Sequence, residues 1–206
     1  MDRCRLVFIM GVQRSGTNAL FKSLERGANH AYNEAEDSPL FEGFYLRDDA
    51  VVRGVLDGCS GVVLAKPISE TKRRSVSDVI TAYAGYDLSV IWIYRDPINC
   101  YASHIERWTG FRGRPAAFAE SWAERNQSVL DALEIHADRI TLVRYEDLTR
   151  SPAMVVSLGA TIGLRTRSKF RRDHRRGRRA LSSDVISIIE AGTQQALKTL
   201  DSAQEL

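Results

Sequence analysis

The stretch that decides the fold is Leu6-Val7-Phe8-Ile9-Met10-Gly11-Val12-Gln13-Arg14-Ser15-Gly16-Thr17-Asn18. Its first five residues are all apolar, which is typical of a strand buried on both faces, and the run is far too short to span a membrane. A glycine turn follows and leads into a helical pattern at Thr17–Arg26. Backbone N–H groups converge on phosphate where a strand, a loop and a helix follow one another in this way. The sequence therefore predicts an anion-binding loop at residues 11–18.

Further apolar runs alternate with helical patterns along the rest of the chain. The other predicted strands are Gly61–Ala65, Ser89–Tyr94 and Ile140–Arg144. The later helices are predicted at Pro97–Trp108, at Ala116–Leu133, after Ser151-Pro152, and from Ser182-Ser183 towards Leu200. Such alternation predicts an α/β fold whose mostly parallel sheet is flanked by helices. With 206 residues and 44% hydrophobic side chains, we expect residues 1–206 to form a single domain.

Charge is concentrated in one segment near the C-terminus. The net charge is +3, but Arg165–Arg179 holds nine Lys and Arg residues and one acid, so the remainder has 20 basic and 25 acidic residues. This pattern predicts a local phosphate or polyanion site rather than a generally basic surface. The segment lacks apolar periodicity, which indicates a mobile loop, and whether this loop orders on a ligand is left open.

The predicted anion-binding loop differs from that of nucleotide triphosphatases. Their pattern, G-x-x-x-x-G-K-[ST], places a lysine on the β- and γ-phosphates and a hydroxyl on magnesium. Here Gly11 and Gly16 have the right spacing, but Thr17 and Asn18 replace the lysine and the hydroxyl residue. This disfavours ATP chemistry, although a small kinase stays the alternative. The cation Arg14 and the nearby hydroxyls suit a phosphosulfate bound without a metal. A plain strand–turn–helix junction would also contain Gly16, so a second signal is needed.

A second segment supplies that signal. Arg95-Asp96-Pro97 follows the predicted strand Ser89–Tyr94, and Ser103 stands two helical turns further on. Asp96 is suited to cap the helix and Pro97 to its first position. Arg95 and Ser103 can therefore face one anion.

Together the two segments resemble the sulfotransferases that use 3'-phosphoadenosine 5'-phosphosulfate (PAPS), a family with a P-loop-like α/β fold. The resemblance implies that Arg14-Ser15-Gly16-Thr17-Asn18 binds the 5'-phosphosulfate and that Arg95 and Ser103 bind the 3'-phosphate. Arg175-Arg176-Gly177 is similar to a family turn that closes on the 3'-phosphate. Tyr145-Glu146-Asp147-Leu148 looks like a structural Y-E-D-L segment of these enzymes.

The resemblance also suggests catalytic residues. Lys66 looks like the family lysine near the bridging oxygen, but Pro67 and Ile68 follow it where phenol and steroid sulfotransferases have a histidine base. Carbohydrate-type members use a glutamate about 18 residues beyond the loop glycine, and Glu34 stands there. The predicted catalytic residues are thus Glu34, Lys66 and Arg14. The alternatives for the base are Glu36, Glu70 and His104.

The expected acceptor is a hydroxyl or amine of a small metabolite, lipid or glycan. No motif specifies it, although aromatic residues in 35–57 and 109–115 are candidates for its pocket. We expect no metal, no nucleic-acid partner and no stable membrane insertion. A nucleic-acid binder that uses the basic segment is the non-enzymatic alternative. Three scattered cysteines suit reduced thiols and hence a cytoplasmic protein. The oligomeric state is left open.

Overall fold

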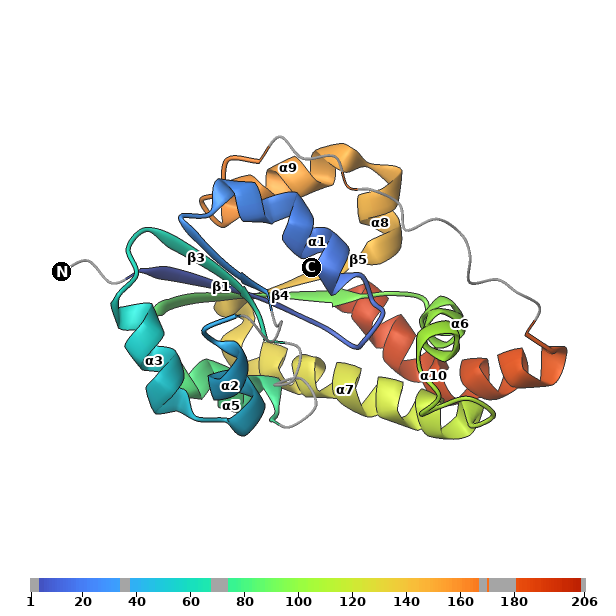
Figure 1. Ribbon diagram of the computed structural model, residues 1–206. Coiled ribbons are helices and arrows are strands. Elements are labelled where there is room, and N and C mark those ends of the chain that lie inside the picture. The colour runs from blue at the N-terminus through green and yellow to red at the C-terminus, as the bar shows by residue number, and fades with distance from the viewer. Residues whose placement is uncertain (1–3, 34–37, 68–73, 167–169, 171–180, 205–206) are drawn as a thin grey trace.

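A five-stranded parallel sheet forms the centre of the structure (Figure 1). The computed structural model describes residues 4–33, 38–67, 74–166, 170 and 181–204. The strand order is β2-β3-β1-β4-β5, and every pairing is parallel. The strands are β1 (Arg5–Met10), β2 (His30–Asn33), β3 (Val62–Lys66), β4 (Asp87–Tyr94) and β5 (Ile140–Arg144). The predicted α/β fold with a parallel sheet is therefore confirmed.

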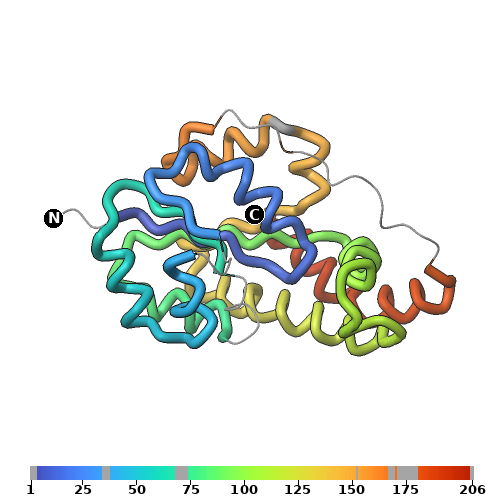
Figure 2. Tube along the Cα trace, viewed as in Figure 1, coloured from blue at the N-terminus to red at the C-terminus, as the bar shows by residue number. Residues whose placement is uncertain are grey.

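Helices cover both faces of this sheet (Figure 1). On one face lie α1 (Thr17–Leu24), α8 (Tyr145–Arg150) and α9 (Pro152–Thr161). The opposite face is covered by α2 (Phe41–Leu46), α3 (Asp49–Asp57), α5 (Val76–Ala82), α7 (Pro115–His136) and α10 (Ser183–Gln204). The 3-10 turn η1 (Glu25–Gly27) follows α1, and η2 (Ala137–Arg139) precedes β5. The two long helices α7 and α10 pack against each other, as the Cα trace in Figure 2 also shows.

The central strand illustrates why the sheet is buried on both sides. Val7 and Ile9 of β1 belong to the core under α1 and α9, whereas Leu6, Phe8 and Met10 belong to the core on the side of α7. All five side chains are fully buried. Because each buried side chain of this size contributes about 1.5–3 kcal/mol, the strand is held firmly from both faces. The apolar run read from the sequence is thus a doubly covered parallel strand.

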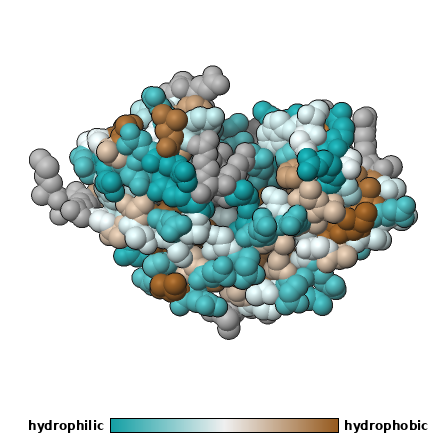
Figure 3. All heavy atoms as spheres, turned by 90° about the horizontal axis from the view of Figure 1, so that it is seen from below, coloured by the Kyte–Doolittle hydropathy of each residue, from teal (hydrophilic) through white to brown (hydrophobic). Residues whose placement is uncertain are grey.

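Figure 3 shows how apolar and polar side chains are distributed on one face of the molecule. Figure 3 views the molecule from below, and this face is mainly hydrophilic, with apolar residues in small separate groups. Single exposed apolar residues are ordinary on folded proteins. Among the described residues, no helix has the length and apolar character that crossing a bilayer requires.

The strand order creates a crevice at the carboxyl edge of the sheet. From β1 the chain goes to β2 and β3 on one side and then crosses to β4 and β5 on the other. Ligands of open α/β sheets bind outside the carboxyl ends of the strands, where the order reverses in this way. The ends of β3, β1 and β4 lead to Lys66, the loop 11–16 and Arg95. The topology therefore brings together three segments that the sequence analysis selected.

The sequence reading of residues 29–57 needs correction. No strand was predicted in this part of the chain, but His30–Asn33 form β2, which pairs with β3 at the edge of the sheet. Residues 38–57, where no helix was predicted, contain α2 and α3. Phe44 of α2 is buried against Phe8 and Tyr83, with ring centroids 5.7 and 6.5 Å away. This aromatic residue is core rather than pocket lining.

A substitution at Gly11 tests the close approach of the backbone after β1 to the backbone of β4. Gly11 has φ 155°, and a Cβ built on it would lie 2.3 Å from the carbonyl oxygen of Ile93. We expect Gly11→Ala to destabilise the protein by about 2–4 kcal/mol, because a backbone atom cannot move aside as a side chain can. Urea unfolding followed by circular dichroism measures the change.

Gly54→Ala is the matched control, because Gly54 lies within α3 and nothing stands within 4 Å of the added Cβ. This variant should gain about 0.5–1 kcal/mol from the better helix propensity of alanine. Equal stabilities of the Gly11→Ala variant and the wild type would contradict the described close approach.

Candidate active site

The loop between β1 and α1 has an unusual backbone. Arg14 has φ 71° and Gly16 has φ 110°, both in the left-handed region, and Gly16 caps the N-terminus of α1. Ser15 N–H donates to the carbonyl of Val12 at 3.1 Å, which closes a tight turn. The first N–H groups of a helix lack acceptors within it. At the start of α1 these groups face a cavity lined by Gly16, Thr17, Asn18 and Ala19. This is the geometry of an anion cradle.

The hydroxyls of the loop are buried within it. Ser15 is fully buried, and its Oγ has no hydrogen-bond partner among the described residues. Thr17 is also buried. A buried hydroxyl without a partner is costly, which fits a ligand as the missing partner. The two hydroxyls lie in the loop where the sequence analysis expected an anion.

Tyr145, which directly follows β5, packs against the loop between β1 and α1. A Cβ on Gly16 would lie 2.3 Å from Cδ2 of Tyr145, so the ring packs directly against this glycine. The guanidinium carbon of Arg95 lies 4.4 Å from the centre of the same ring. Arg95 Nη1 donates to the carbonyl of Arg14 at 3.3 Å, while its buried Nε has no partner among the described residues. Arg95 is thus held against the loop with donor capacity left for an anion.

Helix α6 (Pro97–Arg107) brings Ser103 to the same place. The Asp96 carboxylate caps this helix by accepting from Asn99 N–H at 2.8 Å, and Pro97 stands at its first turn, as predicted. Ser103 is buried, and its Oγ accepts from Nε of Arg14 at 2.9 Å. The Arg14 side chain therefore reaches across to α6 and joins the two segments that the sequence analysis assigned to two phosphates.

The corner at Arg95 and Asp96 is fixed by the Y-E-D-L segment. Glu146 Oε1 accepts from the Asp96 N–H at 3.4 Å, and burial raises the pKa of Glu146 above its ordinary value. Arg144 pairs with Asp201 of α10 at 3.0 Å. The C-terminal helix is thereby fastened to the sheet next to the site. The segment has a structural role, as the family resemblance implies.

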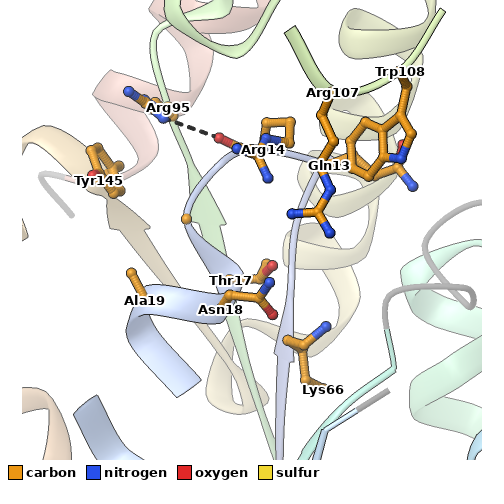
Figure 4. Close-up of a pocket in the computed structure, with 11 residues that line it drawn as sticks. Gln13, Arg14, Thr17, Asn18, Ala19, Lys66, Arg95, Arg107, Trp108 and Tyr145 are labelled. Carbon is orange, nitrogen blue, oxygen red and sulfur yellow. Dashed lines mark hydrogen bonds between the residues drawn. The ribbon is translucent and has the colours of Figure 1, made fainter. Parts of the chain in front are cut away.

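One cavity connects these groups (Figure 4). Its volume is about 200 Å³. Besides the loop and helix residues 13–14 and 16–19, it is lined by Lys66, Arg95, Arg107, Trp108 and Tyr145. Four of the lining side chains are cationic, and no carboxylate among the described residues lines it. Because like charges at close quarters repel, a cavity of this kind is suited to an anion with several negative charges.

Lys66 enters the cavity at the end of β3. It is 5% exposed and stands beside Asn33, the last residue of β2, in the register of the two strands. Lysine is rarely buried to this extent in folded proteins. The predicted catalytic residues Lys66 and Arg14 thus line the same cavity as the predicted cofactor-binding residues Gly16, Thr17, Asn18 and Arg95.

Several predicted site residues lie outside the described residues. These are Glu34, Glu36 and Glu70 among the base candidates, and the turn Arg175-Arg176-Gly177. The fourth base candidate, His104, is described and is buried. Its ring packs near Trp108 and Phe111, with both centroids 5.0 Å away. His104 is not among the residues that line the cavity described above.

Two cavity residues were missed by the sequence analysis. Gln13 was quoted only as part of the loop, and Arg107 was not singled out. Arg107 stands one helical turn beyond Ser103 on α6, so the i, i+4 spacing was the available signal. No carboxylate within 4 Å of Arg107 is found in the described parts of the chain. Those parts also hold no group of three or more His, Cys, Asp or Glu side chains able to bind a metal.

Comparison with known proteins identifies the fold. No family profile matches the sequence, and no curated protein matches it significantly. Among solved structures, a sulfotransferase from Alicyclobacillus acidocaldarius has a TM-score of 0.62 at 18% identity, covering 97% of this chain and 95% of that one. The sulfotransferase domain of the curacin biosynthetic pathway has 0.58 at 14%, covering 98% and 99%. That of the Synechococcus PCC 7002 olefin synthase has 0.53 at 15%, covering 98% and 95%.

The chain therefore has the sulfotransferase fold over nearly its whole described length. This confirms, at the level of the fold, the family resemblance drawn from the two phosphate motifs. Because a fold hosts many activities, the function must be argued from the site itself.

Proposed function

We propose that the protein is a sulfotransferase that moves the sulfuryl group of PAPS to a hydroxyl or amine of a small metabolite, lipid or glycan. The observation that supports this proposal is one cationic cavity in which Arg95 and the loop at the start of α1 meet. Ser103 does not line this cavity, but its hydroxyl is hydrogen-bonded to Arg14, which does. PAPS has phosphate groups at both ends of its ribose, which suits a paired site of this kind.

Different residues of the chain would bind the two anionic groups of the donor. The backbone N–H groups at the start of α1, with Ser15 and Thr17, would hold the 5'-phosphosulfate. Arg95 would bind the 3'-phosphate through the buried Nε that lacks a partner among the described residues, and Ser103 would bind it through its hydroxyl. We assign Arg175, Arg176 and Gly177 to the same phosphate from the family resemblance. Charge-assisted hydrogen bonds of this type are the strong ones in proteins.

When bound, PAPS supplies a sulfuryl group whose bond to the 5'-phosphate oxygen breaks as a bond to the acceptor forms. Lys66 and Arg14 stand at the cavity, where their charges can stabilise the leaving phosphate. Glu34 is proposed to take the acceptor proton, with Glu36, Glu70 and His104 as alternatives. Asn33, directly before Glu34, lies beside Lys66 in the sheet. The base candidate is therefore adjacent in the chain to a residue at the cavity edge.

An assay with sulfur-labelled PAPS tests the proposal. The protein is incubated in EDTA with mixtures of alcohols, phenols, amines and glycans, and label transfer is separated by chromatography. We expect labelled product without any added metal. Transfer of the γ-phosphate of labelled ATP in magnesium, with no transfer from PAPS, would contradict the proposal and identify a kinase instead.

A further inference from the structure

Arg107 lines the cavity but has no role in the proposed binding of the donor. It comes from the last turn of α6, and its guanidinium carbon lies 5.5 Å from the centre of the Trp108 ring. Figure 4 shows Arg95 and Arg107 on opposite sides of the phosphate loop. The Arg107 side chain points into the cavity towards the side where Lys66 lies. Arg107 thus stands apart from Arg95, although it lies one helical turn from Ser103 on α6.

The surroundings of Arg107 leave its charge available. The described residues place no carboxylate within ion-pair distance of it, and the side chain is exposed. Among the described residues, its guanidinium stacks on the Trp108 ring, which restricts the side chain without neutralising it. Arginine is suited to bind carboxylate or phosphate through two parallel hydrogen bonds. Gln13 lines the same cavity and offers an amide donor.

In an in-line transfer the acceptor attacks the sulfuryl group from the side opposite the leaving phosphate. Of the four cationic side chains that line the cavity, Arg14, Lys66 and Arg95 are assigned to the donor, which leaves Arg107 for the acceptor. A cation on the acceptor side would repel a cationic acceptor and attract an anionic one. Arg107 is therefore positioned to select among acceptors rather than to hold the donor.

We propose that Arg107 is a specificity-determining residue that binds an anionic group of the acceptor, so that the preferred acceptors are hydroxy compounds carrying a carboxylate or a phosphate. This inference rests on the proposed function, because it requires the donor to bind the other cationic side chains of the cavity. It narrows the acceptor from any hydroxyl or amine to one with a negative charge near the reacting oxygen.

Binding to the PAP-saturated protein tests this inference without knowing the natural acceptor. The probes are two matched pairs, 4-hydroxybenzoate against 4-hydroxybenzamide and glycerol 3-phosphate against glycerol, measured by calorimetry. We expect at least one acid to bind about tenfold more tightly than its neutral partner, which corresponds to a single charge-assisted contact. Arg107→Ala should abolish this difference, and Arg107→Lys should retain part of it.

Arg26→Ala is the control for net charge, because Arg26 is an exposed arginine in η1, and it should leave all affinities unchanged. Equal binding of acids and neutral partners, or no detectable binding of either acid, would overturn the inference. A loss of PAP affinity in Arg107→Ala would also overturn it and assign the residue to the donor. If the wild type fails to bind PAP at all, the proposed function itself is wrong.

Discussion

Replacing Arg95 with alanine should weaken the binding of adenosine 3',5'-bisphosphate (PAP) about 100-fold, the loss expected for hydrogen bonds to a doubly charged phosphate. Arg95 is the cation whose buried Nε lacks a partner among the described residues, and it lies between the loop and Tyr145. Calorimetric titration with PAP measures the effect. Most of the loss should come from the 3'-phosphate contact, because we assign the 5'-phosphate of PAP mainly to the loop.

A second ligand separates this contact from damage to the loop. Adenosine 5'-phosphosulfate lacks the 3'-phosphate, so Arg95→Ala should reduce its affinity only a fewfold. Arg26→Ala controls for the lost positive charge and should change neither affinity. Equal losses for both ligands would show that Arg95 acts through its hydrogen bond to the Arg14 carbonyl and not through the 3'-phosphate.

Replacing Glu34 with glutamine should lower turnover about 100-fold or more while PAP binds normally, because glutamine keeps the shape of the side chain but cannot accept a proton. The expected size is that of a lost general base in a proton transfer. Turnover is followed with labelled PAPS and an acceptor found in the proposed screen, and PAP binding is measured on the same samples.

Matched variants distinguish the base candidates. Glu36→Gln, two residues further along the chain, and Glu70→Gln, four residues after Lys66, change the same functional group, and both should keep most of the activity. Full turnover of Glu34→Gln together with normal PAP binding would remove Glu34 from the mechanism. A loss confined to Glu36→Gln or Glu70→Gln would transfer the role to that residue.

The strands buried on both faces could be predicted from the sequence, because burial on both sides leaves an uninterrupted apolar run. Leu6–Met10 and Ser89–Tyr94 fall within β1 and β4. β2 was missed because an edge strand of four residues, His30–Asn33, is only partly covered and includes polar side chains. Its assignment depends on pairing with β3, which is a long-range contact that periodicity does not record.

Helix α3 carried local signals that the sequence analysis passed over. Asp48 caps it by accepting from Ala50 and Val51 N–H groups, and Val52 and Leu56 follow at helical spacing. These are ordinary start and burial signals. The segment was instead treated as variable because it contains no motif for chemistry.

The residues of the candidate site could be predicted from the sequence where they stand at or just after the end of a strand. The loop and Arg95 come directly after a parallel strand and Lys66 ends one, so the sheet alone brings them to one edge. The hydrogen bond from Arg14 to Ser103 depends on side-chain direction, and the entry of Arg107 into the cavity depends on the path of α6. The i, i+4 spacing from Ser103 was a signal for Arg107, but the direction of either side chain follows only from the packing of α6.

The most direct test of the central claim is a calorimetric titration of the protein with PAP in buffer containing EDTA. The account predicts saturable binding of one PAP with a micromolar or lower Kd, unchanged when magnesium is added, and at least tenfold weaker binding of AMP, which lacks the 3'-phosphate. Absence of PAP binding, or nucleotide binding that requires magnesium and favours ATP, would contradict it.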